Sequence, residues 1–112
     1  MAIALGTFIE QTDGSFTGIM RTLNVTASLV IIPVRKPSQN APDYRVYDGN
    51  GQHCEVGAGW SHTAKSSGET YLSLKIAAPE FGPNWLRARL VKVDGPQEDS
   101  ASHLILWEPR ER

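Results

Sequence analysis

The chain has 112 residues, of which 40% are hydrophobic and 21% are charged, a composition typical of one soluble globular domain with a single core. Its formal net charge of −1 argues against nucleic-acid binding that relies on bulk positive charge, although a local basic patch stays open. No apolar run approaches the ~20 residues of a transmembrane helix, and the N-terminus lacks the basic segment of a secretory signal. We therefore expect a cytoplasmic protein with no membrane partner.

Short segments of alternating polar and apolar residues, separated by turn residues, predict strands along the whole chain. Asp13-Gly14 and Ser66-Ser67-Gly68 are turn signals, because glycine adopts the positive φ that tight reversals require. Residues 29–32 are apolar throughout, so we expect their strand to be covered on both sides. The predicted strands span residues 3–10, 16–23, 25–34, 44–47, 52–62, 71–76, 85–93 and 103–107.

Residues 71–76 and 85–93 show the clearest alternation in the chain, with every second residue apolar. In the second of these strands the alternation reverses at residues 91–93, and a bulge near Leu90 would explain the reversal. The predicted inward residues of the two strands are Leu72, Leu74, Ile76, Leu86, Ala88 and Leu90.

The strand predicted over residues 52–62 alternates small or apolar residues with glycine and polar residues. Its apolar residues predict the inward face, which leaves Gly57 and Gly59 on the outside. Trp60 and Trp107 are predicted to be core or near-core anchors, because large aromatic side chains dominate burial in small β domains. The predicted inward residues of this strand are Cys54, Val56, Ala58 and Trp60.

The chain contains no segment with a helical period. We therefore predict an all-β fold, a small antiparallel barrel or sandwich of about eight short strands joined by meander connections. One domain is expected over residues 1–107, followed by a short charged tail at 108–112.

The chain carries, in order, the segments IALGTF (3–8), GIMRTL (18–23), NAPDYRV (40–46), GAGW (57–60), YLSLK (71–75) and LILW (104–107). This pattern resembles an uncharacterised bacterial family, the domain of unknown function numbered 736, over nearly the whole chain. The resemblance implies a short cytoplasmic β protein, often encoded near plasmid, conjugation or other mobile-element genes. It brings no catalytic residue to this sequence.

Metal binding and nucleophilic catalysis both fail on strand geometry. The candidate metal ligands do not converge on one point, because neighbours on a strand point to opposite faces. The same alternation separates Ser61 from His62 and His53 from Cys54. We therefore expect no metal, no cofactor and no enzymatic activity. The candidate ligands considered are His53, Cys54, Glu55, His62 and His103.

The remaining candidate site is a pair of outward rows on the strands at 71–76 and 85–93. If these strands form a hairpin, the rows join into one aromatic and basic patch. Such a patch suits single-stranded nucleic acid, because rings stack on bases and cations follow phosphates. It suits a protein partner as well, and it is also compatible with a solvated face that has no ligand. The predicted site residues are Tyr71, Lys75, Trp85, Arg87 and Arg89, with Ser73 between them.

These observations predict a non-enzymatic binding or accessory module, associated with plasmid or mobile-element functions, that acts through protein interaction or self-association. The last strand is apolar on both faces, so either the face with Ile105 and Trp107 or the face with Leu104 and Leu106 must lie outside, which favours a dimer. The alternative is a single-stranded nucleic-acid-binding module resembling an OB-type barrel. The protein partner is preferred here because the net charge is not basic.

Overall fold

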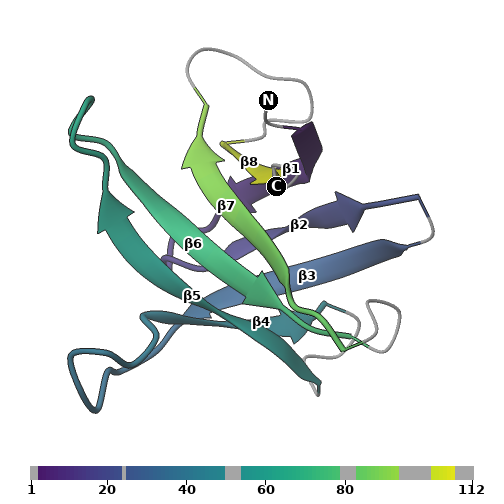
Figure 1. The fold of residues 1–112 in the computed structure, drawn as a ribbon, viewed down its shortest axis with the longest axis horizontal. Coiled ribbons are helices and arrows are strands. Elements are labelled where there is room, and N and C mark those ends of the chain that lie inside the picture. The colour runs from purple at the N-terminus through teal and green to yellow at the C-terminus, as the bar shows by residue number, and fades with distance from the viewer. Residues whose placement is uncertain (1–2, 24, 50–53, 79–82, 94–101, 108–112) are drawn as a thin grey trace.

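The structure, a computed structural model, describes residues 3–23, 25–49, 54–78, 83–93 and 102–107 (Figure 1). The described part is all-β, as predicted, and it forms no helix that is long and apolar enough to cross a membrane. The strands are β1 (Ile3–Glu10), β2 (Phe16–Arg21), β3 (Thr26–Pro33), β4 (Tyr44–Asp48), β5 (Glu55–Thr63), β6 (Thr70–Ile76), β7 (Leu86–Lys92) and β8 (His103–Trp107).

Each strand pairs antiparallel with the strand that follows it, and β8 also pairs with β1, so the sheet closes into a barrel. Of the two predicted architectures, the structure is therefore the barrel, with the predicted meander connections. An OB-fold has five strands in a Greek-key order. The predicted likeness to an OB-type barrel is wrong in both strand number and connection.

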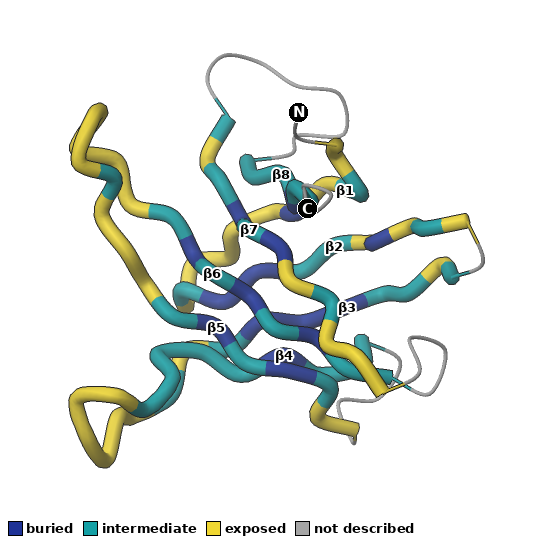
Figure 2. The backbone as a smooth tube through the Cα atoms, in the orientation of Figure 1, coloured by how far each residue is buried: buried dark blue, intermediate teal, exposed yellow. Residues whose placement is uncertain are grey.

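The barrel interior is filled by side chains, as expected where eight strands leave room for little else. Apart from Ser15 in the β1–β2 turn, the buried residues among those described lie within the strands, and exposed residues mark the β5–β6 turn and the β3–β4 loop (Figure 2). Residues 29–31 are buried, including Val30 on the outer face, whereas the outward Ile32 is only half-buried, so the predicted cover on both sides is present at Val30 but not at Ile32. The core cluster contains Phe8, Phe16, Met20, Leu29, Ile31, Val46, Leu72, Leu74, Ile76, Ala88, Leu90 and Ile105.

The prediction for β5 was wrong about which of its faces points inward. Gly57 pairs with Ile76 and Gly59 pairs with Leu74, and cross-strand partners share a face, so both glycines point into the barrel. A Cβ atom on Gly57 would overlap the backbone carbonyl oxygen of Lys75. Glycine is therefore required where β5 passes this close to β6, and Ala58 and Trp60 point outward. Val56 lies at the register shift between β4 and β5 and packs against the core, as predicted.

Two residues predicted to point inward from this strand, Trp60 and Cys54, are not in the core. Trp60 pairs with Ser73 on the outer face and is only half-buried. Cys54 is an exposed free thiol that precedes β5. Trp107, predicted as a core or near-core anchor, is half-buried and lines an open apolar groove at one end of the barrel together with Ile3 and Leu86.

The predicted bulge near Leu90 is absent, because β7 keeps a regular register with both of its neighbours. The register shifts that the structure shows lie between Ala4 and Gly6, where β1 faces β8, and between Val46 and Tyr47, where β4 faces β5. Val91 simply lies on the outer face, opposite Leu104 of β8. The reversed alternation in the sequence therefore reflects an apolar residue on the outside of the barrel.

Both predicted glycine turns are present. Gly14 has a φ of 88° and Gly68 a φ of 75°, the left-handed region that only glycine adopts without strain. At the first turn, the backbone N–H and the hydroxyl of Ser15 donate to the Asp13 carboxylate over 2.9 and 2.7 Å, and they lower its pKa. The predicted tail at 108–112 lies outside the described residues.

The inward glycines lead to a prediction about stability. We expect Gly57→Ala to lower the free energy of unfolding by about 2 to 3 kcal/mol, because a backbone atom must move to admit the new Cβ. Gly59→Ala is the matched control, since its Cβ would meet a movable methyl group of Leu74 at 2.9 Å, and we expect a loss of roughly 1 kcal/mol. Urea denaturation measures both values. Equal losses would contradict the assignment of the close contact to Gly57.

Candidate aromatic and basic binding face

The structure brings the five predicted site residues to one outer face of the barrel. Tyr71 and Lys75 lie on the outside of β6, and Arg87 and Arg89 lie on the outside of β7. Trp85 immediately precedes β7 and is 56% exposed. Lys75 faces Arg87 and Ser73 faces Arg89 across the predicted hairpin, whose pairing is present as expected.

Two further aromatic residues join this face from β5, and the sequence prediction missed both. His62 lies opposite Tyr71, with ring centroids 5.5 Å apart and ring planes 32° from parallel. The ammonium of Lys75 lies 5.7 Å from the ring centroid of Trp60, a cation–π distance. We call this surface the aromatic–basic face, and it consists of Trp60, His62, Tyr71, Ser73, Lys75, Trp85, Arg87 and Arg89.

Trp60 is held in place by the loop between β3 and β4. Its indole N–H donates to the backbone oxygen of Asn40 over 3.2 Å. The same loop is fixed to β5 because the N–H of Ser61 donates to the Asp43 carboxylate over 2.8 Å, and the ammonium of Lys36 lies 3.2 Å from its other oxygen. These two contacts, the Ser61 hydrogen bond first, lower the pKa of Asp43. The ring is therefore held in place by contacts within the fold itself.

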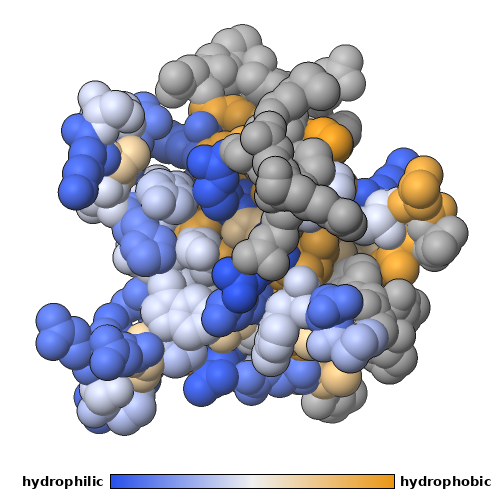
Figure 3. Space-filling view, in the orientation of Figure 1, coloured by the Kyte–Doolittle hydropathy of each residue, from blue (hydrophilic) through white to orange (hydrophobic). Residues whose placement is uncertain are grey.

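The charge on the aromatic–basic face is positive. Lys75 and Arg87 lie directly opposite each other, an arrangement that costs free energy in a sheet unless an anion offsets it. Neither forms an ion pair with a carboxylate of the described residues, where the ion pairs found are Lys36 with Asp43 and Arg45 with Glu55. In Figure 3, hydrophilic side chains gather over the β5–β6 turn, whereas hydrophobic ones gather near the β2–β3 turn. The face therefore presents uncompensated positive charge among the described residues.

The barrel end next to the β5–β6 turn contains a second group of polar side chains. The ring of His103 stands edge-on to Phe16, with centroids 4.7 Å apart, and burial lowers the pKa of His103. Burial likewise raises the pKa of Tyr44, which lines the same opening. These groups mark a partly desolvated polar opening in the barrel.

The hydroxyl of Ser102 lies 2.9 Å from Nδ1 of His103, which places a hydroxyl beside an imidazole. The Ser102 oxygen also accepts a hydrogen bond of 2.8 Å from the backbone N–H of Glu10 on β1. It therefore ties β8 to β1, a structural role that accounts for its position.

Among the described residues, the structure places no three His, Cys, Asp or Glu side chains where they could hold a metal ion. Of the candidate ligands considered from the sequence, His53 lies outside the described residues. Cys54 is exposed to solvent.

Comparison with known proteins identifies a family. A family model described as Protein of unknown function (DUF736) matches residues 4–110, nearly the whole chain, and confirms the resemblance expected from the sequence. No curated protein and no solved structure matches the chain.

The lowered pKa of His103 leads to a prediction about pH. Its pKa in the unfolded chain is near 6.5, so the unfolded state binds more protons than the folded state once the pH falls below that value. We expect His103 to make its whole contribution to the free energy of unfolding above pH 6.5, and this contribution to be lost as the pH falls through the pKa of His103 in the folded state.

The variant His103→Gln should lose less stability than the natural chain between pH 7 and 5, as measured by urea denaturation at each pH. Asp13 and Asp43 do not interfere in this range, because their ordinary pKa is 3.8 and the fold lowers it further. Parallel pH profiles for the two proteins would contradict the prediction.

Proposed function

The chain belongs to the family described as Protein of unknown function (DUF736), and we propose from its aromatic–basic face that the protein is a non-enzymatic binding module for single-stranded nucleic acid. The observation that carries this proposal is the opposed pair Lys75 and Arg87. The Lys75 ammonium lies 5.7 Å from the centroid of the Trp60 ring, and neither cation forms an ion pair with a carboxylate among the described residues. Phosphates would offset the repulsion of the pair, and bases would stack on the ring.

The arrangement of rings and cations supports a strand as the ligand. Aromatic side chains come from β5, from β6 and from the residue before β7, and the cations lie among them on β6 and β7. Neighbouring strands lie ~4.8 Å apart, so rings and cations alternate within reach of one extended chain of nucleotides. This pattern suits contacts to bases and to phosphates at the same time.

The charge pattern also bears on the choice between the two ligand classes considered from the sequence. The net charge of −1 favours a protein partner, but it is an average over the whole chain. The outward residues at 58–62, 71–75 and 87–91 include no acidic side chain. A local concentration of cations is what nucleic-acid binding requires, and it supports the nucleic-acid alternative over the protein partner.

We expect the protein to bind a 12-nucleotide oligo(dT) at low salt, measured by fluorescence anisotropy. Arg87→Ala should weaken binding about tenfold and reduce the slope of log affinity against log salt by about 0.7, the value for one phosphate contact to a single strand. Trp85→Ala should weaken binding by about 1 to 3 kcal/mol through the loss of one stacking contact.

Arg35→Ala is the matched control, because Arg35 is exposed, carries the same charge and lies after β3, outside the aromatic–basic face. It should leave the affinity unchanged. An absence of binding at low salt, or equal losses for Arg35→Ala and Arg87→Ala, would contradict the proposal.

Self-association is a second candidate function, and the outer face of β8, β1 and β2 favours it. Ile19 of β2 is 45% exposed and Ile9 of β1 is 39% exposed. Leu104 and Leu106 of β8 point to the same side, with Thr7 pairing both Leu104 and Ile19. Exposed apolar side chains that adjoin one another mark an interaction surface more often than isolated ones do.

If this face joins two copies, sedimentation equilibrium should give a dimer for the natural chain and a monomer for Ile19→Lys, because a charge would be buried at the interface. Ile3→Lys is the control, since Ile3 is 41% exposed but lies at the opposite end of β1 from Ile9. A monomer for the natural chain at all concentrations would exclude this second function.

We also propose a cytoplasmic bacterial protein with an accessory role for plasmids or other mobile elements. The support for this proposal is the family resemblance. A role in the handling of single strands would be consistent with such a setting.

A further inference from the structure

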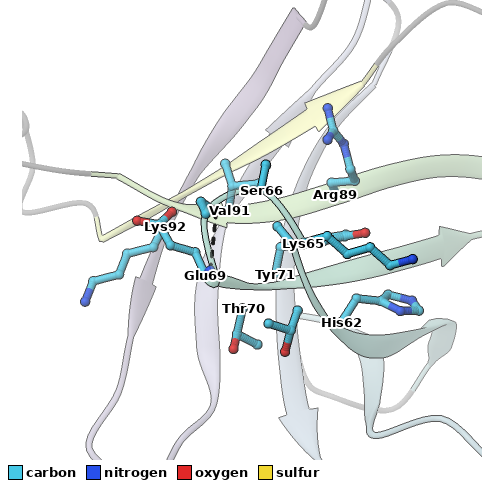
Figure 4. Close-up of a pocket in the computed structure, with 12 residues that line it drawn as sticks. His62, Lys65, Ser66, Glu69, Thr70, Tyr71, Arg89, Val91 and Lys92 are labelled. Carbon is cyan, nitrogen blue, oxygen red and sulfur yellow. Dashed lines mark hydrogen bonds between the residues drawn. The ribbon is translucent and has the colours of Figure 1, made fainter.

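An open groove adjoins the aromatic–basic face where the turn between β5 and β6 stands beside β7 (Figure 4). Its volume is about 670 Å³, within the ~300 to 1,000 Å³ of most small-ligand sites. His62, Lys65 and Tyr71 line one side, and Arg89 and Val91 of β7 line the other. The groove is therefore large enough for one nucleotide.

The turn that forms one wall is fixed by its own hydrogen bonds. The N–H of Ala64 donates to the backbone oxygen of Glu69 over 2.8 Å, and the N–H of Gly68 donates to the backbone oxygen of Ala64 over 2.8 Å. The N–H of Glu69 also donates to the hydroxyl of Ser67 over 3.3 Å. A wall with this many internal contacts loses little conformational entropy when a ligand binds.

The aromatic part of the groove is the pair His62 and Tyr71. Their rings lie 5.5 Å apart and 32° from parallel, so together they present a broad aromatic surface. Surfaces of this kind stack bases without a strong preference for sequence, because every base has a π-face.

The cationic part of the groove is formed by Lys65 and Arg89. In Figure 4 the side chains of His62, Lys65 and Arg89 extend to the same side of the turn. Lys92 also lines the groove, but its side chain extends to the opposite side. An anion beside the His62–Tyr71 pair would therefore meet Lys65 and Arg89, and it would not meet Lys92.

We infer that this groove holds one nucleotide of the bound strand, with its base against His62 and Tyr71 and its phosphate between Lys65 and Arg89. The inference rests on the proposed binding of single strands, and it adds a defined nucleotide site at the turn. The rest of the strand would continue over β6 and β7 toward Trp85.

A crosslinking experiment with the full chain tests this site. A 12-nucleotide oligo(dT) in which 5-iodouracil replaces single thymines should crosslink to His62 or Tyr71 on irradiation, as located by mass spectrometry of the peptides. Lys65→Ala should weaken binding of the unmodified oligonucleotide about fivefold, and His62→Ala should weaken it about fivefold or more. Both residues are exposed, so neither substitution removes a core contact.

Lys92→Ala is the matched control, because it removes the same charge from the same groove lining but on the other side of the turn, and it should leave the affinity unchanged. Crosslinks confined to Trp60 and Trp85, together with unchanged binding by Lys65→Ala, would overturn the nucleotide site and leave the proposed function standing. Equal losses for Lys65→Ala and Lys92→Ala would also overturn it, since they would indicate a diffuse charge effect. An absence of any strand binding would overturn the proposed function itself, and the site with it.

Discussion

The aromatic–basic face depends on the close approach of two backbones inside the barrel. At Gly57 the chain of β5 passes so near the carbonyl oxygen of Lys75 that no side chain fits at this inward position. This constraint fixes the alternation of the whole strand, because a shift of one residue would turn every side chain to the other face. Trp60 and His62 point outward as a result, beside Lys75 and Tyr71 of β6. The surface proposed to bind single strands is therefore a consequence of how the interior is packed.

The strands that were predicted well have an inner face of large apolar residues. Residues 71–76 needed no more than their alternation, and the glycine turns at residues 14 and 68 follow from positive φ. In β5 the inner positions hold glycine and the outer ones a large aromatic ring, so hydrophobicity predicts the opposite orientation. Only the position of the neighbouring backbone decides between the two, and a sequence does not contain it. For the same reason, half of the aromatic residues on the binding face were missed.

The outside of the barrel is divided into surfaces of different chemistry. The outer side of β6 and β7 carries cations and rings, whereas the outer side of β1, β2 and β8 carries Ile9, Ile19, Leu104 and Leu106. A net charge near zero conceals this division, because it sums over all surfaces. Since the two surfaces meet along β7 and β8, a pair of copies joined at the apolar side would leave both basic sides open. Self-association and strand binding are therefore compatible in one molecule.

The meander order has a consequence for how the barrel forms. Every pairing except one joins strands that are consecutive in the sequence, and so encloses a short loop of chain. The exception joins β1 to β8, where the N–H of Glu10 reaches the hydroxyl of a residue 92 positions away. The entropy lost on closing a loop increases with its length, so this seam is the costliest contact to establish. We expect the sheet to grow hairpin by hairpin as an open, curling ribbon, and its two free edges to meet last.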